Sequence, residues 1–276
     1  MLKTRVITAL VLMALLLPSL FYMPQFGWAC LIAGFVGLAA WEWGALIGWK
    51  SSQRIGLGVV TASACVVVAT LDPEAVGAGV EFLPQRWWVW LAYGLSAGFW
   101  CLTIPLWLKF KWSLNGVLGL VVGGVVLFPT WLAMVQLRAL GAWVLLAIFA
   151  VVWMADIAAY FSGKKFGKHK LAPSISPGKT REGAIGACVG VLVYGLVVRH
   201  FFAADLMAMP FWIGGLIAMT AISIVGDLYE SMLKRKAGIK DSSNILPGHG
   251  GVLDRIDSLT STLPMAALLW LLFFIR

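Results

Sequence analysis

The chain has 276 residues, of which 61% are hydrophobic and only 12% are charged, and its formal net charge is +9. Soluble domains carry about 25% charged residues, so a chain this apolar cannot cover its surface with polar groups in water. The composition therefore excludes an ordinary water-soluble protein and predicts an integral membrane protein.

Apolar runs that approach the length of a bilayer follow one another along the whole chain. A spanning helix needs about 20 mostly apolar residues. The first run follows Lys3 and Arg5 as in a signal peptide, but no small-residue cleavage site follows it, so we expect an uncleaved span. We predict an all-α fold, a single polytopic membrane domain over residues 1–276. Its nine spans lie near 5–22, 26–48, 55–71, 87–108, 114–137, 141–162, 183–203, 210–230 and 259–275.

Lysine and arginine residues gather on one side of this arrangement. If the nine spans alternate in direction, 17 of the 21 basic residues fall on the side of the N-terminus and 4 on the other. Basic residues favour the cytoplasmic side of short loops. The bias predicts a multi-pass protein of the inner membrane with a cytoplasmic N-terminus. It also places the two longest polar segments, 163–182 and 231–258, at the cytoplasmic face, where we expect the active site.

Acidic residues are concentrated beside the second of these segments. Asp227 and Glu230 are three residues apart at the end of the eighth span, so they share a helix face. Asp254 and Asp257 have the same spacing just before the ninth span and would share a face if that stretch is helical. Acids are costly so close to apolar helices, so two such pairs indicate a functional site.

Two further acids, Glu42 and Asp156, lie inside or near the ends of apolar spans. An ionisable group at such depth is a functional candidate by default, and the alternative is a polar contact between helices. We expect the helix contact for Glu42. For Asp156 both interpretations stay open.

The mixture of acids, bases and glycines in 231–258 indicates phosphate chemistry assisted by a metal. Mg²⁺ prefers oxygen ligands, usually one or two carboxylates together with phosphate oxygens. Lys and Arg neutralise the remaining phosphate charge, and the glycines of the stretch 247–251 let the backbone approach an anion closely. Positive-inside bias alone would also explain any single lysine here, but it does not explain the acids.

Other kinds of site lack their motifs. The segment 176–180 ends like a P-loop, but Pro173 stands where the first glycine should be. No HExxH motif or CxxC pair is present, and the three histidines are too scattered for a zinc site. We expect the four cysteines to be small buried hydrophobic residues rather than ligands or disulfides: Cys30, Cys65, Cys101 and Cys188.

Four short motifs follow one another in 231–258: Ser-x-x-Lys-Arg from Ser231, Lys-Asp from Lys240, Pro-x-His-Gly-Gly from Pro247, and Asp-Arg-x-Asp from Asp254. Together they resemble the signature of the phosphatidate cytidylyltransferase family, with every fixed position present. Upstream, the stretch from Asp156 to His169 and the motif from Ser176 to Gly183 resemble two other polar motifs of that family. The resemblance is strong over 156–258, which carries the motif-bearing loops, and only general before residue 150.

The resemblance implies a membrane fold of about nine helices that converts CTP and phosphatidate into CDP-diacylglycerol and pyrophosphate, a step of phospholipid biosynthesis. Asp227 and Asp254 match the family's metal-binding acids and would hold Mg²⁺, while Asp257 and Lys179 complete the catalytic set. The family also suggests a second cation such as K⁺ and a homodimer, and we expect no nucleic-acid partner. The candidate substrate-binding residues are Ser176, Thr180, Lys234, Arg235, Lys240, Asp241, His249, Gly250, Gly251 and Arg255.

Two other functions would fit parts of the pattern. A CTP-dependent polyprenol (dolichol-type) kinase would share the Mg²⁺ site but accept an alcohol. An ion-coupled transporter would use Glu42, Asp156 and Asp227 as relay groups, with acids near the bilayer midplane and broken helices in corresponding halves. The acids crowd one face here and no internal repeat is visible, so we favour the cytidylyltransferase.

Overall fold

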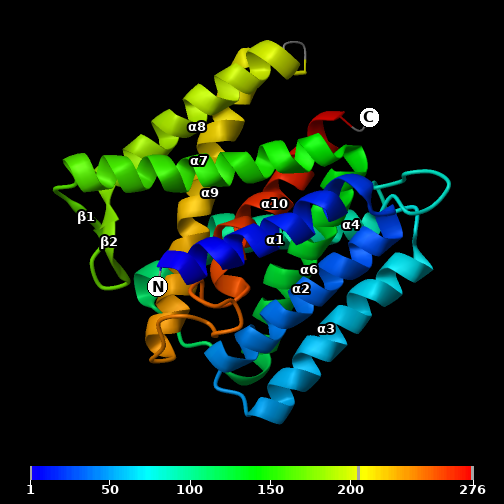
Figure 1. Cartoon of the computed structure of the whole chain (residues 1–276), viewed down its shortest axis with the longest axis horizontal. Coiled ribbons are helices and arrows are strands. Elements are labelled where there is room, and N and C mark those ends of the chain that lie inside the picture. Colours follow the sequence, from blue (N-terminus) through cyan, green and yellow to red (C-terminus); the bar gives the residue numbers. More distant parts are fainter. Residues whose placement is uncertain (1, 204–205, 275–276) are drawn as a thin grey trace.

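The computed structural model describes residues 2–203 and 206–274 (Figure 1). Within those ranges, nine helical segments are long and apolar enough to cross a membrane. The elements, in chain order, are α1 (Leu2–Tyr22), α2 (Gln25–Leu46), α3 (Ser51–Leu71), α4 (Trp87–Gly98) continuing through the π-helical η1 (Phe99–Thr103) into α5 (Ile104–Phe110), α6 (Gly116–Leu140), α7 (Ala142–Phe166), β1 (Lys170–Ala172), β2 (Ser176–Thr180), α8 (Arg181–Phe202), α9 (Met209–Lys236) and α10 (Leu253–Phe274).

These segments confirm the predicted all-α membrane fold, and the main differences concern the ends of two helices. The apolar runs predicted that the eighth span ends near 230 and that the ninth begins near 259. In the structure α9 continues to Lys236 and α10 begins at Leu253. Basic residues in the last turn of α9 favour this extension because they face the negative end of the helix dipole. The earlier start of α10 places Asp254 and Asp257 on helical backbone, as their spacing predicted.

A small antiparallel hairpin, β1 with β2, joins α7 to α8 and was absent from the sequence prediction. Glu182, in the first turn of α8, holds the start of this hairpin. Its carboxylate accepts hydrogen bonds from the backbone N–H groups of Lys168 and His169 and contacts His169 Nδ1 at 2.6 Å. Strands this short are held by such contacts more than by their two-stranded ladder, because an isolated hairpin is only marginally stable.

The helices α2, α6 and α10 form the centre of the bundle. In α2 and α6, 61% of the apolar window is buried inside the protein, against 6% in α1. Tryptophan side chains join α2 to α6: the indole N–H of Trp28 donates to the carbonyl of Met134, and that of Trp131 donates to the carbonyl of Ala29. Both tryptophans bury large apolar surfaces while their N–H groups are hydrogen-bonded, so they belong to the core.

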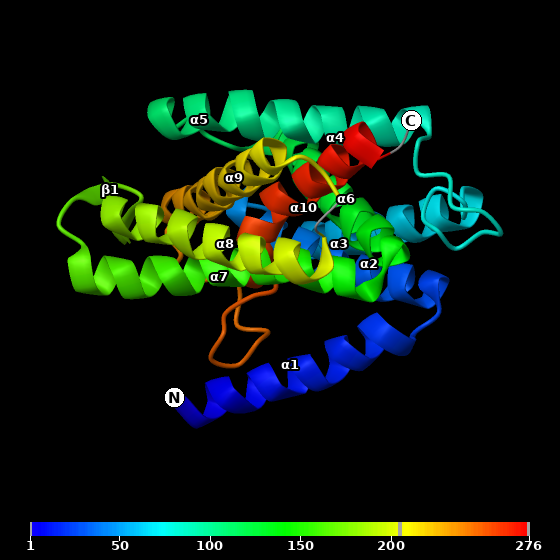
Figure 2. The same ribbon diagram turned by 90° about the horizontal axis from the view of Figure 1, so that it is seen from above.

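Hydrogen bonds from helix side chains to connecting loops mark the two ends of the bundle. At one end, which we call the site end, Thr8 Oγ1 donates to the carbonyl of Pro247 at 2.9 Å. Figure 2 shows α1 lying apart from the other helices, with the loop before α10 reaching toward it. At the opposite end, which we call the far end, Gln25 Nε2 donates to the carbonyl of Val76 at 2.9 Å. All candidate site residues named above lie at the site end.

Candidate active site

A cavity of about 360 Å³ lies among α7, α8, α9 and the hairpin. Charged side chains reach it from three different elements: Asp156 and Lys164 from α7, Lys179 from β2 and Asp227 from α9. Ser223 and Ser258 add hydroxyl groups to the wall. Motifs distant in the sequence therefore meet around one space that is rich in oxygen atoms.

A larger cavity, of about 570 Å³, lies between α3, α4 and α6. Its lining is apolar except for Asp72, whose carboxylate accepts from the indole N–H of Trp88 at 3.1 Å. It contains none of the predicted site residues. Chemistry on charged phosphates needs convergent polar groups, so we place the candidate site at the smaller cavity.

Lys179 and Asp227 form an ion pair at the edge of the smaller cavity. Their side chains are 25% and 26% exposed, so both remain accessible. Asp227 also accepts a hydrogen bond from Ser231 Oγ at 3.2 Å, one helical turn further along α9. Thr180, the residue after Lys179, caps α8 by accepting from the backbone N–H of Gly183 at 3.1 Å. That cap fixes the end of β2 and so the point from which Lys179 extends.

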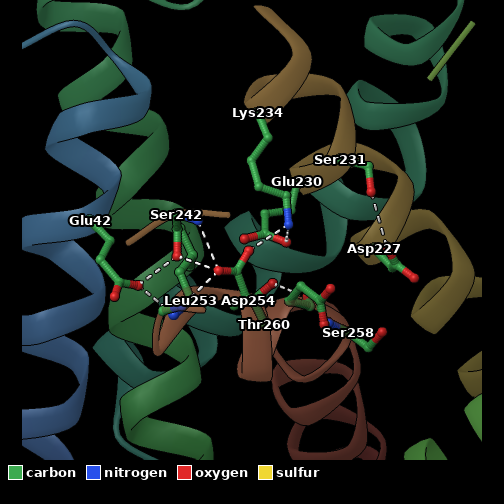
Figure 3. A network of polar contacts seen from close by, with 12 residues as sticks. Glu42, Asp227, Glu230, Ser231, Lys234, Ser242, Leu253, Asp254, Ser258 and Thr260 are labelled. Atoms are coloured by element: carbon green, nitrogen blue, oxygen red, sulfur yellow. Dashed lines mark hydrogen bonds and ion pairs between the residues drawn. The ribbon is translucent and has the colours of Figure 1, made fainter. Parts of the chain in front are cut away.

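Asp254 is the centre of a second cluster, drawn in Figure 3. Its Oδ1 accepts from Lys234 Nζ at 2.6 Å. Its Oδ2 accepts from the backbone N–H groups of Ser242 and Gly251, each at 2.8 Å, and lies 2.9 Å from Ser242 Oγ. Both carboxylate oxygens are thus engaged by protein donors, and a metal ion bound here would have to displace Lys234 or share Oδ1 with it.

Lys234 points into the protein rather than toward the loop surface. Its side chain is 13% exposed and its ammonium group lies between two carboxylates, Asp254 and, at 2.9 Å, Glu230 Oε2. The other oxygen of Glu230 is buried and has no hydrogen-bond partner among the described residues. Two buried carboxyl groups thus share one lysine at the site end.

Asp257 connects the two clusters. Its Oδ1 accepts from the backbone N–H of Ser258 at 2.7 Å. Its charge interacts with those of Asp227, Asp156 and Lys234. Asp156, Asp227 and Asp257 therefore form one acidic region next to Lys179.

The other predicted residues lie at the same end but in different surroundings. Arg235, Lys240, Asp241 and Arg255 are exposed, whereas Ser176 is half-buried at the start of β2. In the turn 246–250, Gly248 and Gly250 have φ values of +77° and +84°, which favour glycine. His249 lies between them, and its Nδ1 is buried without a hydrogen-bond partner in the described part of the chain.

Sequence reasoning missed two contributors to this end of the bundle. From the sequence, positive-inside bias was sufficient to explain Lys164, but the structure places this residue in the lining of the cavity. Glu42 makes the expected contact between helices, with the first turn of α10, but it also binds the loop that carries the signature motif. The available signal was its position as a lone acid between two tryptophans in an apolar run.

The chemistry of these donors suits Mg²⁺, which takes carboxylate and other oxygen ligands. Asp227 lines the cavity, Asp257 directly precedes the lining residue Ser258 in α10, and Ser223 and Ser258 supply neutral oxygens. Across residues 2–203 and 206–274, no three His, Cys, Asp or Glu side chains converge into a ready-made metal cluster. A magnesium ion would therefore depend on one or two carboxylates and on oxygens supplied by a bound phosphate.

Comparisons with known proteins extend over nearly the whole chain. The family model described as the cytidylyltransferase family matches residues 3–273. A phosphatidate cytidylyltransferase of Pseudomonas aeruginosa is 42% identical over 280 residues, covering 98% of this chain and 97% of that protein. A protein of the same name from Haemophilus influenzae is 39% identical and covers 96% of each chain, and one from Brucella suis is 48% identical over 45% of this chain and 44% of its own. The chain belongs to the cytidylyltransferase family.

Proposed function

We propose that the chain is a phosphatidate cytidylyltransferase, which joins the cytidylyl group of CTP to phosphatidate and releases pyrophosphate. The observation that carries this proposal is the cavity where Lys179, Asp227 and Asp156 meet at the site end. Relatives matched over almost their full length carry the same name. Neither a polyprenol kinase nor a transporter gains support from these matches.

The reaction needs no activated serine or cysteine. A phosphate oxygen of phosphatidate attacks the α-phosphorus of CTP, a new P–O bond forms, and the bond to the departing pyrophosphate breaks. The nucleophile is already an anion, so the protein's task is to bring two negatively charged substrates together. Catalysis then consists of positioning and charge neutralisation, as in other phosphoryl transfers.

Lys179 is the residue we assign to the phosphates of the substrates. It extends from β2 to the cavity edge and is paired with Asp227 there. An arriving phosphate would compete with Asp227 for the ammonium group. Arg235, Lys240 and Arg255 are exposed at the same end and would neutralise further phosphate charge. We assign Lys234 mainly to holding Asp254, because two carboxylates already surround it.

Asp227 would hold Mg²⁺, with Asp257 beside it and with Asp254 if its oxygen Oδ1 is shared with Lys234. The ion, when bound, supplies charge neutralisation on the triphosphate. Asp227 would release Lys179 on taking up the ion. The freed ammonium group of Lys179 would then be available to a substrate phosphate. A second cation such as K⁺ and a homodimer stay predictions from the sequence.

Phosphatidate is a lipid and would reach the cavity from the side of the bundle. Tyr160 lines the cavity and is also 61% exposed on the outer surface of α7. The wall beside it is therefore open to the surroundings of the helices, where lipid would lie. We place the site end at the cytoplasmic face of the inner membrane because 17 of the 21 basic residues fall on that side of the nine predicted spans.

The test of the proposed reaction compares two acceptors. Protein purified in detergent would receive CTP and Mg²⁺ with either phosphatidate or a polyprenol, and both pyrophosphate and lipid products would be measured. We expect CDP-diacylglycerol and pyrophosphate in equal amounts with phosphatidate, and no turnover with polyprenol. Formation of CDP and a polyprenyl phosphate would contradict the proposal.

A further inference from the structure

Glu42 is 0% exposed in α2, yet its hydrogen-bond donors come from a segment about 200 residues later in the chain. Its Oε1 accepts from Ser243 Oγ at 2.6 Å and from the backbone N–H of Val252 at 2.9 Å. Its Oε2 accepts from the backbone N–H of Leu253 at 2.6 Å and lies 3.0 Å from Ser242 Oγ. One carboxylate thus holds both the loop and the first turn of α10.

Ser242 links Glu42 to Asp254. Its hydroxyl oxygen lies 3.0 Å from Glu42 Oε2 and 2.9 Å from Asp254 Oδ2 (Figure 3). A hydroxyl group carries a single proton, so it cannot make a full hydrogen bond to both carboxylates at once. The two acids are therefore coupled through this group. A side chain at Gly251 would occupy the place of the Ser242 hydroxyl and of Glu42 Oε1, which explains why glycine is needed there.

The arrangement requires a side chain at position 42 whose two oxygens both accept hydrogen bonds. The donors that point at it include two backbone N–H groups at the start of α10, which carry the positive end of the helix dipole. A glutamine would keep the shape but would turn an NH₂ group toward at least one of these donors. The loop would then have to shift to avoid placing donor against donor.

We propose that Glu42 is a positioning residue for the cytidylyl transfer: it fixes Ser242 and the first turn of α10, and these in turn aim Asp254 at Lys234. The proposal rests on the proposed function and deepens it. Asp254 receives four donors, three of which come from Ser242 and Gly251, and both of those lie against Glu42. Movement of the loop would therefore alter the direction of Asp254 without removing any group that contacts substrate.

The experiment measures steady-state kinetics of CDP-diacylglycerol formation by the purified full chain. The main variant is Glu42→Gln, and the matched control is Glu81→Gln, an exposed glutamate outside the site. Ser242→Ala removes the link to Asp254. Ser243→Ala removes a donor to Glu42 but no contact with Asp254.

We expect Glu42→Gln to lower kcat by about 10- to 100-fold, as loss of a supporting carboxylate does at other sites, with KM for CTP and phosphatidate little changed. Ser242→Ala should lower kcat more than Ser243→Ala does. In the double variant of Glu42 and Ser242, the fold-loss in kcat should be smaller than the product of the two single fold-losses. Both changes break the same link from Glu42 through Ser242 to Asp254. Glu81→Gln should match the wild type.

Three results would overturn the inference: a kcat for Glu42→Gln within twofold of the wild type, equal losses in the two serine variants, or independent losses in the double variant. If Glu42→Gln does not fold, Ser242→Ala is the deciding variant. A lower kcat at an unchanged melting temperature would support the link from Glu42 through Ser242 to Asp254, and an unchanged kcat would refute it. A wild-type protein that makes no CDP-diacylglycerol would instead refute the proposed function, so the two failures are distinct.

Discussion

Arg138 and Lys234 are both partly buried basic residues, but they lie in opposite surroundings. At the far end, Arg138 donates to uncharged oxygens: the carbonyls of Leu20 and Met23, and Oε1 of Gln25. At the site end, Lys234 lies between the carboxylates of Glu230 and Asp254. The first arrangement satisfies its donors with neutral groups and so serves the fold. The second buries two carboxyl groups with one lysine, which is expensive unless it has a function.

Two further buried side chains of the far end, Gln136 and Tyr93, also make neutral hydrogen bonds. Gln136 Nε2 donates to the carbonyl of Ala75 at 2.7 Å, and its Oε1 accepts from Tyr93 OH at 2.9 Å. Both side chains are fully buried. Together with Arg138, they tie the loop after α3 and the turn after α1 to α6. Arg86 at the far end also contacts two carboxylates, those of Asp72 and Glu74, but its side chain is 40% exposed. A buried cluster of ionisable groups, rather than burial or charge alone, therefore sets the site end apart.

The largest expected effect is on the site end alone and follows from removal of the metal. Excess EDTA should abolish CDP-diacylglycerol formation, because the acidic region cannot accept a triphosphate without a cation to bridge them. Added Mg²⁺ should restore the rate, while the melting temperature should change little in the absence of CTP. Full activity in a metal-free preparation would show that the acids serve some other purpose.

A smaller but still large loss is expected for Lys179→Ala. Removal of its charge leaves Asp227 without its ion-pair partner and leaves substrate phosphate without a neutralising group. We expect kcat/KM for CTP to fall about 100- to 1000-fold, the range for loss of one preorganised donor. Lys168→Ala, on the exposed start of the same hairpin, is the control and should stay within about twofold, as for most surface changes. Equal losses in both would mean that general positive charge, not position, is what matters.

The smallest effect on activity is expected at the far end. Arg138→Ala should lower the melting temperature by several degrees, because charged hydrogen bonds contribute about 1.5–3 kcal/mol each and the acceptors would be left unsatisfied. The kcat of the folded fraction should match the wild type. A fall in kcat at an unchanged melting temperature would break the contrast between the two ends.

The spans were predictable because an apolar run of sufficient length has few alternatives in a bilayer. The acidic pairs were also predictable, since spacing by three places Asp254 and Asp257 on one helix face. The direction of Lys234 was not, because it depends on where α10 begins relative to α9. Glu42 could not be assigned from local sequence, since its donors are brought to it only by the complete fold.

The hairpin of β1 and β2 was missed for a similar reason. Its strands have three and five residues, too short for a periodic pattern, and its start is fixed by Glu182 from the following helix. Without it, Lys179 would have no defined position. The motif residues were thus predictable as a set, while their arrangement around the cavity required the tertiary structure.

One pair of variants tests most directly whether the smaller, charged cavity is the reaction site. Asp227→Asn and Asp72→Asn each remove one negative charge from a cavity-lining carboxylate, in the smaller and the larger cavity respectively. CDP-diacylglycerol formation would be measured for both at saturating Mg²⁺, with melting temperatures as the check on folding. We expect kcat to fall at least about 100-fold for Asp227→Asn and to stay near the wild type for Asp72→Asn. Near-normal turnover by folded Asp227→Asn would contradict the assignment of the site.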